Sequence, residues 1–93
     1  MTNREKSEAI AKAFTIEPRA TLKNTINAAV RKLPGGNELL DALEATNAAR
    51  NHAHRAKAND RVVAIDAALN RFEDIREAME RYVFRKAGIA DES

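Results

Sequence analysis

Hydrophobic residues recur at three- and four-residue spacing through most of the chain, which is the period of an amphipathic α-helix. A first short helix is predicted over residues 2–14, because Thr2 and Glu5 have the spacing of a capping box. A second helix is predicted over residues 19–33, and it ends at the Pro-Gly-Gly turn of residues 34–36. No segment alternates with a period of two, so no strand is expected.

Two longer helices are predicted in the rest of the chain. Asn37 is a good N-cap for the third helix, and its first turn is acidic. Small side chains then follow at helical spacing, which lets a neighbouring helix approach closely. This stripe consists of Leu39, Ala42, Thr46, Ala49, Ala53 and Ala56. The fourth helix is predicted over residues 60–87, with Asn59 or Asp60 as its cap and Gly88 at its C-terminal end. Its hydrophobic stripe is formed by Val62, Ile65, Leu69, Phe72, Ile75, Met79, Tyr82 and Val83. Residues 89–93 are expected to form a tail.

The predicted helices and their short connections favour an all-α fold. We expect a compact antiparallel bundle of three main helices plus a short N-terminal helix, in a single domain over residues 1–93. A chain of this length builds only a small core, so self-association into a homo-oligomer is expected. The absence of cysteine removes disulfides and thiolate chemistry. No membrane span and no signal peptide are predicted, and a soluble cytoplasmic protein is expected.

Residues 45–61 are alanine-rich and strongly basic. They set six cationic or potentially cationic side chains against one acid, Asp60. The six are Arg50, His52, His54, Arg55, Lys57 and Arg61. Because guanidinium and ammonium groups bind phosphate oxygens, we predict that the arginines and the lysine of this set contact structured RNA, with His52 or His54 as a contributor. The segment holds no aromatic residue, so readout of shape and charge is expected. The alternative is a solvated helix end whose cations complement the helix dipole.

The two histidines allow further interpretations. His52 and His54 lie about 200° apart around a helix, so they cannot hold one metal ion from that helix alone, and neither a metal site nor a cofactor is predicted. Arg50 and His54 share a helix face. This pair resembles the arginine-to-histidine motif of the helical HEPN ribonucleases, in which four to six residues intervene rather than the three found here. That resemblance implies an RNA-cleaving site at Arg50 and His54, although we expect a non-catalytic protein.

Three large side chains stand in consecutive positions at residues 82–84. A helix turns only about half of its circumference to one core, so at least one of the three should face outward. Tyr82 and Phe84 are therefore predicted to form a partner interface. The alternative is that Ile89 and the N-terminal helix cover them.

The helix end of residues 30–34, the Ile65-Asp66 pair with Leu69 and Phe72 after it, and the Ala-Gly-Ile of residues 87–89 carry a resemblance to known helical proteins. Residues 30–89 are similar to the four-helix proteins of ribosomal-RNA intervening sequences and to the accessory variability proteins of diversity-generating retroelements. Those families continue into a fourth helix where this chain has its last residues, and the acids of its final predicted helix are denser than theirs. The resemblance implies a basic, non-enzymatic bundle that self-associates into a ring, contacts structured RNA and docks on a reverse transcriptase.

The sequence thus predicts a non-catalytic helical binding module that contacts structured RNA and docks on a protein partner such as a reverse transcriptase. The first alternative is a small phage-type or mobile-element adaptor or inhibitor. It would act by protein–protein contact through Tyr82, Phe84 and the acidic face of the last helix. The second alternative is a HEPN-like ribonuclease.

Overall fold

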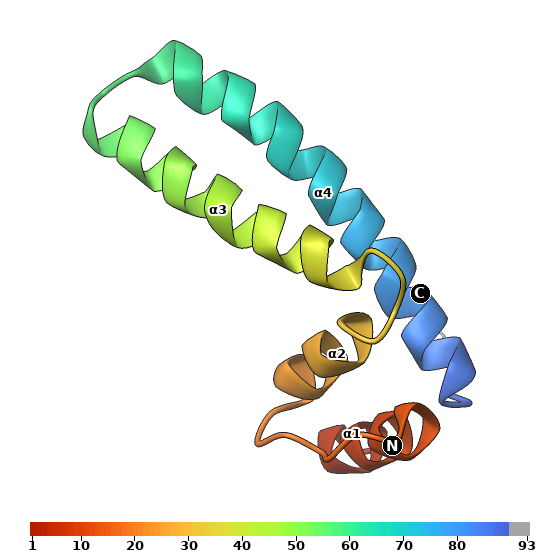
Figure 1. The fold of residues 1–93 in the computed structure, drawn as a ribbon. Coiled ribbons are helices and arrows are strands. Elements are labelled where there is room, and N and C mark those ends of the chain that lie inside the picture. Colours follow the sequence, from red (N-terminus) through yellow and green to blue (C-terminus); the bar gives the residue numbers. More distant parts are fainter. Residues whose placement is uncertain (90–93) are drawn as a thin grey trace.

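The computed structural model describes residues 1–89 of the 93-residue chain, and this part consists of four α-helices without a strand (Figure 1). The helices are α1 (Asn3–Phe14), α2 (Leu22–Val30), α3 (Gly36–Arg55) and α4 (Asn59–Lys86). The predicted all-α, four-helix-bundle fold is confirmed.

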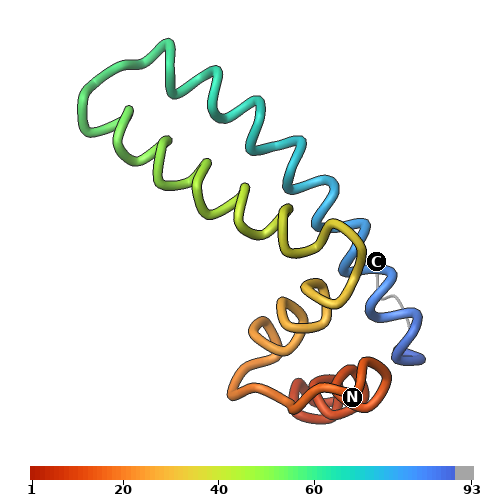
Figure 2. The backbone as a smooth tube through the Cα atoms, in the orientation of Figure 1, coloured from red at the N-terminus to blue at the C-terminus, as the bar shows by residue number. Residues whose placement is uncertain are grey.

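Helices α3 and α4 run antiparallel and form a long hairpin, while α1 and α2 lie across one end of it (Figures 1 and 2). The molecule measures 44 × 25 × 24 Å, because the hairpin extends well beyond the two short helices. All four helices meet at the end where α3 begins and α4 finishes. The other end of the hairpin consists of two helices alone.

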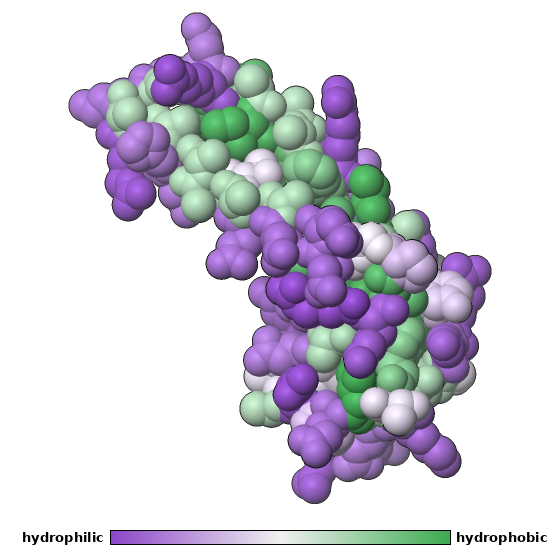
Figure 3. Space-filling view, in the orientation of Figure 1, coloured by the Kyte–Doolittle hydropathy of each residue, from purple (hydrophilic) through white to green (hydrophobic). Residues whose placement is uncertain are grey.

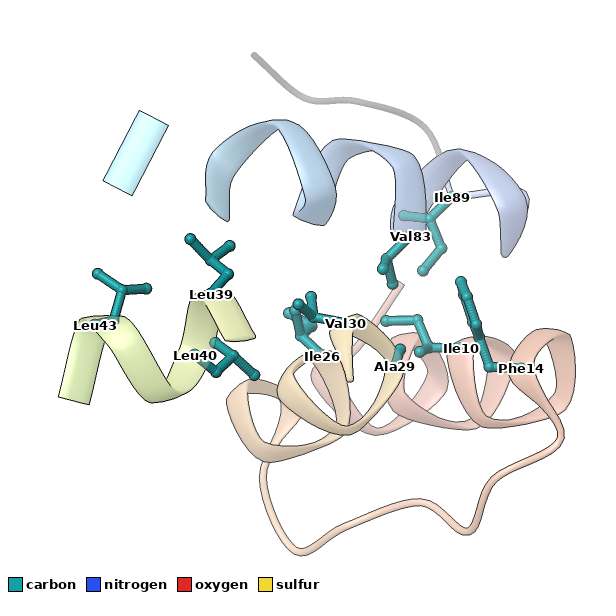
Figure 4. Packing of buried hydrophobic residues seen from close by; sticks show 10 residues of the cluster. All are labelled: Ile10, Phe14, Ile26, Ala29, Val30, Leu39, Leu40, Leu43, Val83 and Ile89. Atoms are coloured by element: carbon teal, nitrogen blue, oxygen red, sulfur yellow. The ribbon is translucent and has the colours of Figure 1, made fainter. Parts of the chain in front are cut away.

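The hydrophobic core lies where the four helices meet (Figure 4). It contains Ile10, Phe14, Ile26, Ala29, Val30, Leu39, Leu40, Leu43, Val83 and Ile89. The core therefore joins residues from near both ends of the chain. A cation–π contact adds to this junction, since Lys86 Nζ lies 4.8 Å from the centre of the Phe14 ring.

Helix α1 begins as the sequence predicts. The Thr2 hydroxyl accepts the Glu5 backbone N–H at 3.1 Å, and the Glu5 carboxylate accepts the Thr2 backbone N–H at 3.1 Å. These hydrogen bonds to Thr2 hold the pKa of the exposed Glu5 carboxyl below its usual value. The capping box is thus confirmed, and it satisfies two backbone donors at the helix start.

Helix α2 is shorter than predicted at both ends, and at its start a buried side chain bonds the backbone that was expected to be helical. The buried Thr25 hydroxyl accepts the Arg19 backbone N–H at 2.9 Å and donates to the Thr21 carbonyl at 3.1 Å. This holds residues 19–21 outside the helix, and Thr21 caps it. At the other end the helix stops at Val30, ahead of the predicted limit.

The prediction that Asn37 caps α3 was wrong. The N-cap is Gly35, with a φ of 77°, and the helix begins at Gly36. A Cβ on Gly36 would lie 2.7 Å from the carbonyl carbon of Val30, so the end of α2 and the start of α3 meet at a distance that requires glycine. Asn37 lies inside the first turn, where its side-chain oxygen accepts Arg31 Nη1 at 3.1 Å.

The ends of α4 also differ from the sequence-based expectation. Its N-cap is Ala58 and has no side-chain cap hydrogen bond, so neither Asn59 nor Asp60 plays that part. Gly88, with a φ of 75°, follows the last turn as expected. Ile89 is buried in the core rather than part of a tail, and its N–H donates to the Phe84 carbonyl at 2.9 Å. The rest of the predicted tail, residues 90–93, lies outside the described residues.

Candidate nucleic-acid interface at the hairpin tip

The hairpin tip, residues 52–61, comprises the end of α3, the turn and the start of α4. The turn closes through backbone hydrogen bonds from Ala58 N to Ala53 O at 2.9 Å and from Lys57 N to His54 O at 3.0 Å. Lys57 adopts a φ of 57°, a left-handed conformation that helix ends usually give to glycine. A lysine in this position costs about 1 kcal/mol, and it stands exposed at the apex of the hairpin.

The turn brings together three of the cations that the sequence predicts to contact RNA. Arg55 ends α3, Lys57 occupies the turn and Arg61 lies in the first turns of α4. All three are exposed, and within residues 1–89 none of them forms a salt bridge. Asp60 is the single acid of the tip. The tip therefore presents a local positive charge at the end of the molecule farthest from the core.

Arg50 differs from the other predicted contacts because it is already paired. Its Nε donates to Oδ1 of Asp66, which lies opposite on α4, and both side chains are about 40% exposed. The pair joins the two helices of the hairpin. Asp66 was not singled out from the sequence as a partner of Arg50. The sequence shows only that Asp66 lies 16 residues after Arg50, on the far side of a predicted turn. That spacing alone does not identify Asp66 as the acid that pairs with Arg50.

His52 and His54 are both exposed near the tip, and their spacing sets them on different sides of α3. His54 lies one helical turn from Arg50, as the motif-based alternative requires. Within the described residues, no three His, Cys, Asp or Glu side chains lie close enough together to hold a metal ion.

The three consecutive side chains at residues 82–84 have different surroundings. Tyr82 is 46% exposed, Val83 is fully buried, and Phe84 is half-buried against the core. Ile89 lies in the same core, as the alternative interpretation expected. Of the two predicted partner contacts, Tyr82 is thus the more accessible.

Sequence reasoning missed a groove on one side of the hairpin. The groove has a volume of about 380 Å³, and we call its lining the apolar hairpin face. This face comprises Ala45, Thr46, Ala49, Ala64, Ile65 and Ala68. Figure 3 shows hydrophobic surface gathered along the hairpin, with hydrophilic side chains at its end and margins. The small stripe predicted to meet α4 is only partly buried, and Ala49 and Ala56 face solvent instead.

Comparisons with known proteins found no matching family model, curated protein or solved structure. The two family resemblances therefore stay predictions. No helix in the described part of the chain is long and apolar enough to cross a membrane. The fold and the site define an all-α four-helix protein with a projecting hairpin that carries a cationic tip and an apolar side.

Proposed function

We propose that this protein is a non-catalytic helical binding module whose hairpin tip contacts structured RNA. The observation that carries the proposal is the exposure of Arg55, Lys57 and Arg61 without acidic partners among residues 1–89. They project from the end of a two-helix arm, where a large anionic surface meets no obstruction from the core.

Phosphate contact by three cations predicts how the affinity for RNA depends on salt. Each neutralised phosphate releases counterions, so the affinity of three contacts should fall about 40-fold between 50 and 200 mM salt. The tip has no aromatic side chain for stacking on unpaired bases, which favours recognition of a folded RNA by shape and backbone. The resemblance of residues 30–89 to RNA-associated bundles supports RNA over DNA.

Binding of a fluorescent RNA hairpin and of a DNA duplex of equal length, followed by anisotropy at several salt concentrations, tests the proposal. The tip variant Arg55→Glu with Lys57→Glu should weaken RNA binding at least about tenfold and lower the salt slope by about 2. The control, Lys23→Glu with Lys32→Glu, makes the same charge change at exposed positions near α2.

The control should bind RNA nearly as tightly as the unmodified protein. Equal losses in the two variants would mean that overall charge, and not the tip, governs binding. Absence of binding at low salt would refute the proposal.

Docking on a protein partner such as a reverse transcriptase forms part of the same proposal. It is supported by the family resemblance and by the exposure of Tyr82. Because exposed aromatic side chains often anchor such interfaces, Tyr82→Ala should weaken capture of a purified partner and leave RNA binding unchanged.

A ribonuclease is the second candidate, because Asp66 holds the Arg50 side chain about one helical turn from His54. In such a site the histidine would transfer a proton and the guanidinium would stabilise charge on the phosphate. Incubation of labelled RNA with the purified protein tests this candidate. His54→Ala should abolish cleavage if it is correct, whereas intact RNA after incubation with the unmodified protein would eliminate it.

A further inference from the structure

A pocket of about 530 Å³ lies between α1 and the segment that leads into α2. It belongs to the four-helix end of the molecule, away from the hairpin tip (Figure 1). Its volume is in the range of pockets that hold small molecules. The lining residues whose chemistry bears on a ligand are Arg4, Ser7, Glu8, Arg19, Thr21 and Leu22.

Ser7 brings to this pocket a polar group without a partner in the protein. The residue is 5% exposed, and Ser7 and Thr25 are the two buried polar residues within residues 1–89. The Thr25 hydroxyl bonds to the backbone of both Arg19 and Thr21. The Ser7 hydroxyl, by contrast, forms no hydrogen bond within the described chain. Because buried polar groups are almost always hydrogen-bonded, a partnerless hydroxyl on the pocket wall indicates a polar ligand there.

The start of α2 adds backbone donors to the same pocket. The Thr21 hydroxyl caps this nine-residue helix by accepting the Asn24 N–H at 3.1 Å. The N–H groups of Leu22 and Lys23 have no acceptor within the helix, because they precede its first hydrogen-bonded turn. No acidic residue lies in this first turn, so no carboxylate of α2 offsets the positive end of the helix dipole. A helix start of this kind favours a bound anion.

The charged side chains of the lining favour an anion as well. Arg4 and Arg19 line the pocket together with one acid, Glu8. Arg4 Nε lies 3.4 Å from Glu8 Oε1, but both side chains are largely exposed, and such a pair contributes little. Arg19 forms no salt bridge within residues 1–89, and its backbone N–H is held by the Thr25 hydroxyl at 2.9 Å. The lining therefore has an excess of positive charge beside the helix start.

Two nearby acids do not line the pocket. Glu17 belongs to a separate groove that also contains Lys12. Glu80 belongs to another groove, which it shares with Lys23 and Arg76, and its Oε1 lies 3.7 Å from Arg76 Nε. Each of these acids thus has a cation in its own groove.

We propose that this pocket binds the phosphate group of a small phosphorylated molecule. The guanidinium groups of Arg4 and Arg19 contact phosphate oxygens, for which their planar forks are suited. The Ser7 hydroxyl and the N–H groups at the start of α2 donate to the remaining oxygens. The pocket is larger than a phosphate ion, and its wall also includes Pro18 and Leu22, which leaves room for an organic part of the ligand.

This site is separate from the proposed RNA contact. The pocket and the hairpin tip lie at opposite ends of the molecule (Figure 1). The tip variant Arg55→Glu with Lys57→Glu should therefore bind a small phosphate ester as tightly as the unmodified protein. Failure of the RNA proposal would leave this site standing, and the reverse also holds.

Two-dimensional amide NMR spectra of the full chain, followed during titration with adenosine monophosphate, test the proposal. The amide signals of Leu22 and Lys23 should shift saturably, and NaCl at equal ionic strength should not reproduce the shifts. Inorganic phosphate and adenosine are titrated in parallel. Equal affinity for inorganic phosphate and the nucleotide would support a site for the free ion, whereas tighter binding of the nucleotide would support a site for a phosphate ester.

An arginine substitution tests the charged contact. Arg19→Gln should weaken binding of adenosine monophosphate about tenfold, because a charged donor is lost. The matched control is Arg71→Gln, which makes the same change at an exposed position of α4 outside the pocket lining and should leave the affinity unchanged. Far-UV circular dichroism checks that both variants keep their helix content.

Ser7→Ala distinguishes a ligand contact from a structural role. It should weaken binding of adenosine monophosphate several-fold, because one hydrogen bond to the phosphate is lost. The melting temperature of the ligand-free protein should stay equal or rise, because a partnerless buried hydroxyl is removed and alanine favours the helix. A lower melting temperature with unchanged affinity would mean that the hydroxyl bonds within the protein, and it would overturn the role proposed for Ser7.

Three results would overturn the site as a whole. The first is the absence of saturable shifts at Leu22 and Lys23 with either phosphate probe up to tens of millimolar. The second is an equal loss of affinity in Arg19→Gln and Arg71→Gln, which would indicate attraction by overall charge. The third is binding of adenosine as tightly as its monophosphate, which would exclude recognition of the phosphate.

Discussion

Replacement of Gly36 by alanine tests the corner between α2 and α3, which orients the hairpin on the core. Gly36 is buried, and its Cβ would overlap the carbonyl of Val30, whose carbon would lie 2.7 Å away. The backbone on both sides is held by hydrogen bonds, from Leu33 N to Val30 O at 2.9 Å and from Gly36 N to Leu33 O at 3.0 Å. The atoms nearest to the added Cβ belong to the backbone of Val30 and Arg31, so a change of side-chain rotamer cannot relieve the overlap.

The expected loss in the free energy of unfolding follows from the displacement of α3 that the added methyl group requires. To reach ordinary van der Waals separation, the start of α3 has to move away from α2, which loosens Leu39 and Leu40 from Val30 in the core. Loss of packing of this kind, added to strained backbone, costs on the order of 3 kcal/mol. A small domain has only about 5 kcal/mol of stability in total. Gly36→Ala should therefore remove more than half of the free energy of unfolding.

Gly35→Ala is the matched control. Its Cβ would meet nothing within 4 Å in residues 1–89, and only the positive φ of 77° opposes it. That conformation costs about 1–2 kcal/mol in a residue other than glycine. Urea unfolding followed by far-UV circular dichroism measures both losses. If Gly36→Ala cost no more than Gly35→Ala, the corner would not be sterically closed and the reasoning would be wrong.

Three other substitutions have defined outcomes. Thr25→Val should lower the free energy of unfolding by about 1–2 kcal/mol, because the Arg19 N–H loses its acceptor while the shape of the side chain is kept. Ile10→Ala, at a fully buried position, should cost about 3 kcal/mol in the same urea assay, and a smaller loss than that of Thr25→Val would contradict the packing described for the core. The lowered pKa of Glu5 means that its capping contribution is present above the unfolded-state pKa and is lost as the pH falls through the folded-state pKa. Glu5→Gln should therefore reduce the difference in melting temperature between neutral pH and a pH below about 4, and an unchanged difference would exclude this contribution.

Hydrophobic spacing was sufficient to predict the four helices, because each one turns a regular stripe toward its neighbours. It failed where a contact between residues six positions apart decides a boundary. Thr25 captures the backbone of Arg19 and delays α2, and the approach of Gly36 to Val30 moves the start of α3. Hydrophobic spacing does not encode such contacts, because they depend on the path of the backbone outside the helix.

The candidate site was predictable to a similar extent. A run of cations across a predicted turn places them at one end of a hairpin, so the exposed tip follows from the sequence. The pairing of Arg50 with Asp66 depends on the rotation of each helix about its own axis. The spacing also could not show that Ala49 lies beside the contact between α3 and α4 rather than within it. Alanine occurs on several sides of α3, so the sequence does not indicate which side faces α4.

The position of the core along the chain has a consequence for synthesis on the ribosome. Ile10 and Phe14 pack with Val83 and Ile89 as well as with α2, so the core around the first helix is closed only when almost the entire chain has been made. Until then α1 and α2 leave exposed the side of this core that α4 later covers. The nascent chain is therefore most prone to aggregation just before α4 is complete, and slower translation of α4 would lengthen that interval.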